Sequence, residues 1–220
     1  MRDGVLEKLS NNSIKEMFKQ VATVMKENCE YLCSLDANMG DGDLGLTMSK
    51  GFGAFADALE MSEENNISRL IYAAAMKMAS AAPSTMGTLM ASGIMGGAKA
   101  IDGDMAIGAL EYCKFLDGFA SAIAARGKCK PGDCTVLDAI HHAVLCAKDT
   151  LKQKETLKEV AYAANIGAEK GLTLTIMMES KFGKAAVFRS KSIGIADQGA
   201  VVGALLLKTM SEYISAHCVV

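Results

Sequence analysis

Tryptophan is absent from this chain of 220 residues, aromatic residues make up only 5% of it, and proline occurs twice. Half of the residues are hydrophobic, and alanine, methionine, leucine and glycine are prominent among the small and apolar types. This composition is typical of closely packed helices and argues against a sheet protein rich in Val, Ile, Thr and Tyr. A chain of this length can bury one sizeable core, so we predict a single domain over residues 1–220.

The chain also lacks an excess of charge of either sign. Its 23 Lys and Arg against 25 Asp and Glu give a net charge of −2, which argues against nucleic-acid and membrane-surface partners. Residues 1–8 lack a signal-peptide apolar region, and no apolar stretch reaches the roughly 18 residues of a membrane span. The seven scattered cysteines form no CxxC pair, and the three histidines are not at zinc-finger spacing. We therefore expect reduced thiols and a cytoplasmic protein.

Apolar residues recur at helical spacing in about eight segments, which predicts an all-α fold. The expected helices cover residues 13–36, 46–59, 68–81, a segment that follows the turn 83–87 and ends near 100, 103–126, a segment from 136, 156–181 and a segment from 197. Capping patterns support three of the starts: Ser13 with Glu16, Thr135 with Asp138, and Thr156 with Glu159. Short connections between so many helices favour an eight-helix antiparallel up-and-down barrel or bundle.

The connections between these helices differ in character. Those after the first, third, fifth and seventh helices are rich in Gly, Asp, Ser and Thr, whereas those after the second and sixth are plain polar breaks. Alternate connections of an up-and-down bundle share one end, so we expect the four special turns to meet at one pole. Helix N-termini at this pole would offer unpaired N–H groups to a phosphate. Further polar groups there are Thr85, Gly87, Thr135, Lys184, Arg189 and Lys191.

The first special turn carries three aspartates, Asp36, Asp41 and Asp43, with glycines between and after them. Glycine costs about 1 kcal/mol in a helix and aspartate prefers caps and turns, so this stretch is not helical. Three hard oxygen donors suit Mg²⁺, although a solvated turn that caps two helices is the alternative. With the phosphate-binding helix ends and the cations, the turn suggests a nucleoside triphosphate site. Walker A, Rossmann and EF-hand motifs are all missing.

At these four turns the sequence resembles the nucleotide-binding L subunit (DhaL, or DAK2 domain) of the dihydroxyacetone kinase family. The similar motifs are Leu32-x2-Leu35-Asp36-x3-Gly40-Asp41-Gly42-Asp43-x-Gly45-x2-Met48-x2-Gly51-Phe52, Ser84-Thr85-Met86-Gly87, Gly127-x4-Gly132-Asp133-x-Thr135-x-Leu137-Asp138-Ala139, Gly183-Lys184-Ala185, Ser192-Ile193-Gly194 and Asp197-x-Gly199-Ala200. They extend over nearly the whole chain in the family's order. The resemblance implies an eight-helix antiparallel barrel with a nucleotide bound at one end.

The resemblance also implies an activity and a site. Phosphate would pass from ATP to a small keto-sugar such as dihydroxyacetone, held by a partner K-type substrate-binding subunit, as in the glycerone kinases of glycerol metabolism. Asp36, Asp41 and Asp43 would hold two Mg²⁺ ions that bridge to the phosphates, and with Lys184 they are the predicted catalytic residues. The implied ATP or ADP contacts are Leu44, Gly45, Leu46, Thr47, Thr85, Met86, Gly127, Val136, Lys184, Asp197, Gln198 and Gly199.

This sequence departs from the family pattern at four positions. Leu44 replaces a frequent histidine, Lys184 replaces an arginine and so loses a bidentate fork, and Gln198 replaces the usual proline. Pro83 stands where the family prefers glycines. Because the aspartates are intact, we expect metal and nucleotide binding to persist, whereas dihydroxyacetone itself is less well supported as the acceptor.

Two other functions stay open from the sequence. One is a phosphotransferase-system type of subunit, in which ADP stays bound as a coenzyme and a phosphoryl donor subunit rephosphorylates it. The other is a nucleotide-sensing regulatory protein without turnover. The sequence does not decide between a monomer and a homodimer.

Overall fold

The computed structural model describes residues 8–101, 103, 106–153 and 156–218, and within them it is all-helical, as predicted. The elements are α1 (Asn11–Glu27), α2 (Cys29–Ala37), α3 (Leu44–Glu60), α4 (Ile67–Ala81), α5 (Thr85–Ala100), α6 (Ala109–Gly127), α7 (Val136–Leu151), α8 (Leu157–Thr175), the 3-10 helix η1 (Lys184–Ser192) and α9 (Gln198–His217). An isolated antiparallel bridge joins Leu9 to Ile107. The absence of a signal peptide, expected from residues 1–8, concerns a segment that lies almost wholly outside the described residues.

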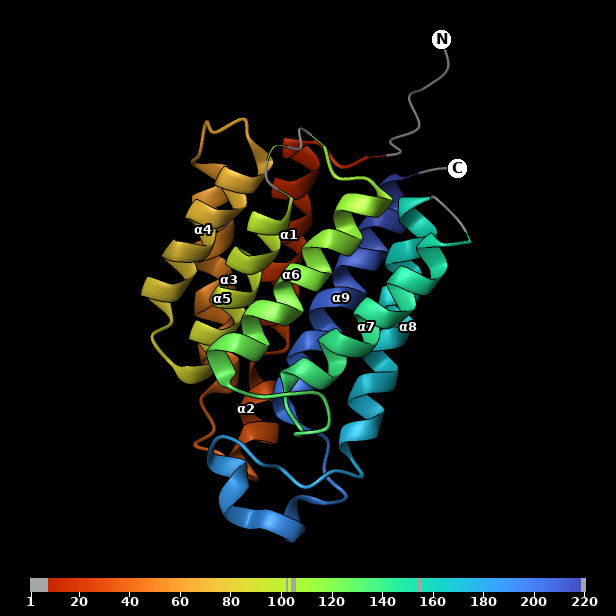
Figure 1. Ribbon diagram of the computed structural model, residues 1–220. Helices are drawn as coiled ribbons and strands as arrows, with labels where there is room; N and C mark the ends of the chain where they lie inside the picture. Colours follow the sequence, from red (N-terminus) through yellow and green to blue (C-terminus); the bar gives the residue numbers. More distant parts are fainter. Residues whose placement is uncertain (1–7, 102, 104–105, 154–155, 219–220) are drawn as a thin grey trace.

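The long helices pack side by side along one axis (Figure 1). α1 packs against α3, each of α3 to α8 packs against the next long helix in the chain, and α9 packs against α1, so the packing order closes into a ring. Figure 1 shows the connections α2–α3, α4–α5, α6–α7 and α8–α9 at its lower end, where α2 and η1 also lie. In the described part of the chain, no helix combines the length and apolar character that crossing a membrane requires.

The first expected helix differs from the structure at its start and in its middle. Its N-cap is Ser10, whose hydroxyl accepts a hydrogen bond from Ser13 N at 3.3 Å, so the predicted cap at Ser13 is wrong. Ser13 is buried inside α1. The helix is also divided at Asn28, whose φ and ψ of −90° and 10° are not helical and whose side chain donates to Val24 O at 2.8 Å. This break turns the expected eight helices into nine within the described residues.

Two later boundaries also differ from the prediction. Gly103-Asp104 was expected to open a helix, but α6 begins at Ala109, after Ile107 has paired with Leu9. Asp104 itself lies outside the described residues. The helix expected to reach residue 181 ends at Thr175, whose hydroxyl donates to Leu172 O and accepts a hydrogen bond from Asp197 N. The predicted caps at Thr135 and Thr156 are confirmed.

The close approach of α7 and α8 depends on glycine. Gly171 of α8 lies directly against the backbone of Asp138 and Ala139 in α7, and a Cβ atom there would overlap the carbonyl oxygen of Asp138. Gly167, one turn earlier, lies against His142 and Ala143 in the same manner. These two contacts hold α8 close to the first turn of α7, which borders the site described next.

Candidate metal and nucleotide site

The four special connections surround one hollow at the lower end of the bundle. A cavity of about 520 Å³ is lined by residues from the α2–α3 turn, the start of α5, the start of α7, η1 and the start of α9. A second cavity of about 810 Å³ adjoins it and shares several of its lining residues, including Asp41, Thr85 and Val136. Volumes of this order suit a small-molecule ligand. The structure therefore brings together turns that lie more than 150 positions apart in the chain.

Asp36 is the organising residue of the acidic turn. It lies near the end of α2 and is only 7% exposed. Its Oδ2 accepts hydrogen bonds from Gly42 N at 2.9 Å and Asp43 N at 3.1 Å, while its Oδ1 accepts one from Gln198 Nε2 at 3.2 Å. Gly42 has a φ of 75°, a left-handed conformation that favours glycine, and this lets the chain fold back onto Asp36.

Asp41 and Asp43 complete a cluster with Asp36. One ligand oxygen from each of the three carboxylates lies within 4.8 Å of the others. Asp43 precedes α3 in the N-cap position, yet its side chain makes no capping hydrogen bond, so capping does not explain this carboxylate. Lys184 of η1 forms an ion pair with Asp41. This hydrogen bond lowers the pKa of Asp41 and raises that of Lys184, so both groups are charged at neutral pH.

The donor set of this cluster fits a hard divalent cation. It consists of carboxylate oxygens, and both Asp41 and Asp43 are exposed and line the cavity. Mg²⁺ is usually held by one or two carboxylates, and it keeps its remaining positions for water and phosphate oxygens. Three converging carboxylates at a cavity mouth are therefore typical of a site where Mg²⁺ also binds a phosphate-bearing ligand. They are less typical of a closed site in which the protein supplies every metal ligand.

Helix N-termini also border the cavity. Leu44, Thr85, Val136 and Gln198 are the first residues of α3, α5, α7 and α9, and all four line it. Each such end carries backbone N–H groups without helical partners and the positive end of the helix dipole. Ser84 caps α5 by accepting from Gly87 N at 3.0 Å, and Thr135 caps α7 by accepting from Leu137 N at 3.2 Å. Four convergent helix ends form a strongly anion-attracting wall.

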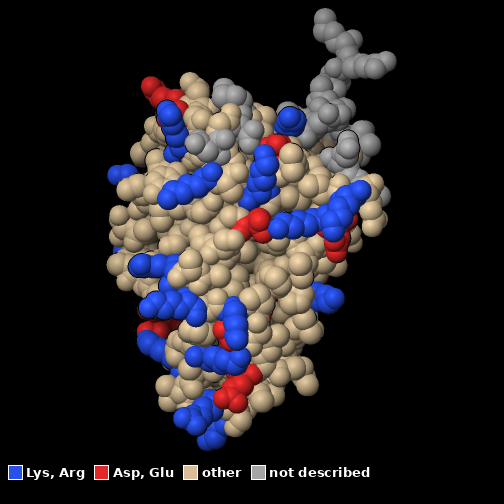
Figure 2. Space-filling model, in the orientation of Figure 1, with Lys and Arg blue, Asp and Glu red and all other residues tan. Residues whose placement is uncertain are grey.

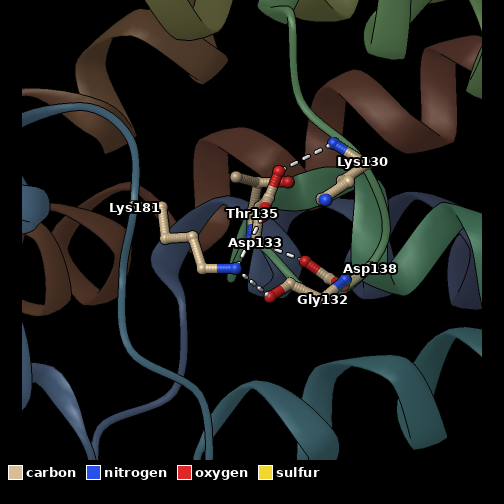
Figure 3. Close-up of polar contacts among 6 residues, drawn as sticks. All are labelled: Lys130, Gly132, Asp133, Thr135, Asp138 and Lys181. Atoms are coloured by element: carbon tan, nitrogen blue, oxygen red, sulfur yellow. Dashed lines mark hydrogen bonds and ion pairs between the residues drawn. The ribbon is translucent and has the colours of Figure 1, made fainter.

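The connection between α6 and α7 is held rigid by buried carboxylates (Figure 3). Asp138 is fully buried and accepts hydrogen bonds from Gly132 N at 2.5 Å and Thr135 N at 2.8 Å. Asp133 accepts from Lys130 N at 2.9 Å and from Lys181 Nζ at 2.8 Å. Lys181 also donates to Gly132 O at 3.2 Å, so it joins the segment after α8 to this loop.

Asp197, the N-cap of α9, has an unusual ionisation. Desolvation of its half-buried carboxylate raises its pKa to about 7, and the negative charge of Asp138 adds to this effect. A hydrogen bond from Ala200 N at 2.7 Å acts in the opposite direction without cancelling it. A group of this kind titrates near neutral pH in the folded protein but near pH 4 in the unfolded chain.

This difference predicts a pH-dependent stability. Between about pH 4 and pH 7 the unfolded chain releases the Asp197 proton while the folded protein keeps it, so this residue makes stability fall as pH rises. Asp197→Asn keeps a good N-cap and removes the titration. Without ligand, we expect the urea midpoint of the variant minus that of the wild type to increase from pH 4 to 7. Above pH 7 this difference should stay constant. The pH dependence of stability that Asp41 and Asp133 contribute is the same in both proteins and cancels in the comparison. A difference in urea midpoint that does not change with pH would therefore contradict the raised pKa of Asp197.

The structure places nearly all of the predicted site residues on these cavities. Those that line the smaller one are Asp36, Asp41, Asp43, Leu44, Thr47, Thr85, Met86, Val136, Lys184, Asp197, Gln198 and Gly199, and Gly127 lines the larger one. Gly45 and Leu46 line neither of these two cavities in the described part of the chain. Gly45 is buried against the backbone of Cys29, and Leu46 is 62% exposed on the outer side of α3.

Some lining residues have no counterpart in the sequence prediction. Phe182, Val187 and Cys134 contribute apolar surface to the smaller cavity, and Arg126 contributes a cation to the larger one. Segment 182–187 has no regular periodicity, so the sequence contains no signal for which of its side chains face inward. Lys and Arg side chains are spread over both the upper and the lower half of the face shown in Figure 2. The expected cations Arg189 and Lys191 are exposed on η1 and line neither cavity.

Comparison with known proteins identifies relatives of this arrangement. The chain is 28% identical over 193 residues to the "PEP-dependent dihydroxyacetone kinase, ADP-binding subunit DhaL" of Escherichia coli (strain K12), covering 87% of this chain and 91% of that protein. It is 30% identical over 214 residues to an L-erythrulose 1-kinase of Mycolicibacterium smegmatis, covering 92% of this chain but only 35% of the kinase.

A solved structure shares the fold. The crystal structure of the dihydroxyacetone kinase from C. freundii in complex with AMP-PNP and Mg²⁺ superposes with a TM-score of 0.68 at 21% identity, over 93% of this chain and 34% of that one. The DAK2 domain model matches residues 38–212, so Asp36 lies two residues before the match. Since the match spans far more than half of the sequence, the resemblance seen at the four turns is confirmed, and this chain belongs to the DAK2 domain family.

Proposed function

We propose that this chain is the Mg²⁺- and ATP/ADP-binding subunit of a dihydroxyacetone-kinase-like phosphotransferase. The observation that carries the proposal is the cluster of Asp36, Asp41 and Asp43, whose oxygens lie within 4.8 Å of one another beside four helix N-termini. The relatives, which include an ADP-binding subunit of a dihydroxyacetone kinase and an erythrulose kinase, support the same reaction class. The proposal treats residues 1–220 as one domain.

In this proposal the three aspartates hold Mg²⁺, and we predict that two ions bind. When bound, Mg²⁺ would supply positive charge close to the phosphate oxygens. The chain's own contribution is positioning, because the N-termini of α3, α5, α7 and α9 donate N–H groups toward the phosphates. Lys184, which pairs with Asp41, would exchange this contact for one with a phosphate oxygen. Gly127 and the larger cavity would take the remainder of the nucleotide.

The proposed acceptor is a small keto-sugar that a K-type substrate-binding subunit or domain holds. In this proposal the acceptor approaches the carboxylates from that partner. The departures at Leu44, Lys184 and Gln198 leave the identity of the sugar open between dihydroxyacetone and larger ketoses. We propose a cytoplasmic location, as the scattered cysteines predict. Both a monomer and a homodimer are compatible with this function.

A second candidate is the type of subunit that uses ADP as a bound coenzyme. The Escherichia coli relative is named as PEP-dependent and ADP-binding, which favours this form. ADP would then remain in the cavity and receive phosphate from a phosphotransferase-system donor subunit. Nucleotide that copurifies and resists dialysis would favour the coenzyme form, whereas readily exchanged ATP would favour an ordinary kinase.

Calorimetric titration with ATP or ADP tests the part that both forms share. We expect binding in the presence of Mg²⁺ and a loss of at least about tenfold in affinity when the metal is removed with EDTA, because the carboxylates then repel the phosphates. The helical circular dichroism should not change on metal removal, since a core of buried apolar residues holds the long helices together. Equal affinity with and without the metal would contradict the proposal.

A further inference from the structure

Gln198 is the one side chain from outside the acidic turn that is hydrogen-bonded to Asp36 in the described part of the chain. It is the first residue of α9, is half-buried, and lies 162 positions from Asp36 in the sequence. Its amide Nε2 donates to Asp36 Oδ1 at 3.2 Å. The assignment of nitrogen rather than oxygen to this contact follows from chemistry, because an ionised carboxylate can only accept.

The hydrogen bonds to Asp36 leave little freedom to its carboxylate. An ionised carboxylate offers about four acceptor positions. Gly42 N and Asp43 N occupy the two on Oδ2, and Gln198 occupies one on Oδ1. A single position on Oδ1 therefore remains for a cation shared with Asp41 and Asp43. Without Gln198, only the two backbone hydrogen bonds to Oδ2 would hold the Asp36 carboxylate, and the carboxylate could rotate more freely.

We propose that Gln198 is a positioning residue that fixes the orientation of Asp36 and thereby sets the affinity of the acidic cluster for a divalent cation. The inference rests on the proposed function, because it takes Asp36, Asp41 and Asp43 as the metal-holding group. It adds that α9 takes part in metal binding without supplying a ligand. Partners that orient ligating carboxylates typically contribute 10- to 100-fold in metal affinity.

Gln198→Met tests this role, since methionine matches glutamine in length but donates no hydrogen bond. Mn²⁺ serves as the probe, and its free concentration is followed by electron paramagnetic resonance with and without ADP. We expect the variant to bind Mn²⁺ about 10-fold more weakly than the wild type. Gln20→Met, an exposed position on α1, is the matched control and should bind as the wild type does.

A double-mutant cycle with Asp36→Asn shows whether the effect acts through Asp36. In the Asp36→Asn background, adding Gln198→Met should change Mn²⁺ affinity by less than twofold, whereas a general disturbance of α9 would weaken both backgrounds equally. Urea unfolding of each variant without ligand reports any loss of stability separately. Equal Mn²⁺ affinity in the wild type and Gln198→Met, or an equal loss in both backgrounds, overturns the inference but leaves the proposed function standing. Failure of the wild type to bind Mn²⁺, with or without ADP, overturns both.

Discussion

Asp41→Asn is expected to weaken Mg²⁺-dependent ATP binding by at least about 100-fold, because partners that merely orient metal ligands already contribute 10- to 100-fold. Asp41 is the residue of the cluster that pairs with Lys184, and it lines both cavities. Its replacement removes a negative charge from the cluster and leaves Lys184 without its partner. The measurement is calorimetric titration of ATP at saturating Mg²⁺.

The same variant should keep its fold. Asp41 lies on an exposed turn between α2 and α3 and contributes nothing to the buried core, so the circular dichroism at 222 nm should match that of the wild type. Asp57→Asn is the matched control, because Asp57 is an exposed carboxylate of α3 that lines neither cavity of the site. Its ATP affinity should be unchanged. If Asp41→Asn bound ATP with wild-type affinity, the assignment of the metal site would be wrong.

Gly171→Ala should destabilise the protein by about 3 kcal/mol, at the upper end of what extra methyl groups cost in packed interiors. The new Cβ would overlap the carbonyl oxygen of Asp138, and neither atom belongs to a side chain that could rotate away. The helices α7 and α8 must therefore separate, which also displaces Asp138 and the loop that it holds. Urea unfolding followed by circular dichroism measures the effect as a fall in the midpoint.

Gly53→Ala provides the opposite expectation from the same chemical change. Gly53 lies in the interior of α3, and a Cβ atom there would meet no other atom within 4 Å. Alanine favours the helix by roughly 0.5–1 kcal/mol over glycine, so this variant should be slightly more stable than the wild type. A similar destabilisation by both substitutions would show that the cost at Gly171 does not arise from the contact with α7.

Much of the site could be predicted from local sequence. Glycine and aspartate in alternate connections, together with the parity of an up-and-down bundle, indicated which turns would meet, and the cavity lining agrees with that expectation. The caps at Thr135 and Thr156 were predictable because a capping box is complete within four residues. The acidic turn was recognisable for the same reason, since its three carboxylates and glycines are neighbours in the chain.

The features that escaped prediction depend on contacts between distant segments. The end of α8 at Thr175 depends on a hydrogen bond from Asp197 N, 22 positions away, and the pairing of Lys184 with Asp41 spans 143 positions. Helical periodicity continues past Thr175 in the sequence, and a local pattern of this kind contains no information about hydrogen bonds to residues so far away. Leu46 was included because the family resemblance implies a nucleotide contact there, but the geometry of a helix turns it outward, where it is 62% exposed.

The packing of α9 against α1 has a consequence for the order in which the protein matures. During synthesis the apolar faces of α1 and α8 that α9 covers have no partner until the 20-residue helix α9 has left the ribosome. Segments that wait for a distant partner stay exposed to aggregation and to chaperones. The hydrogen bond from Gln198 to Asp36 can form only after the start of α9 has emerged. The acidic turn, although made early, would therefore acquire its complete set of contacts last.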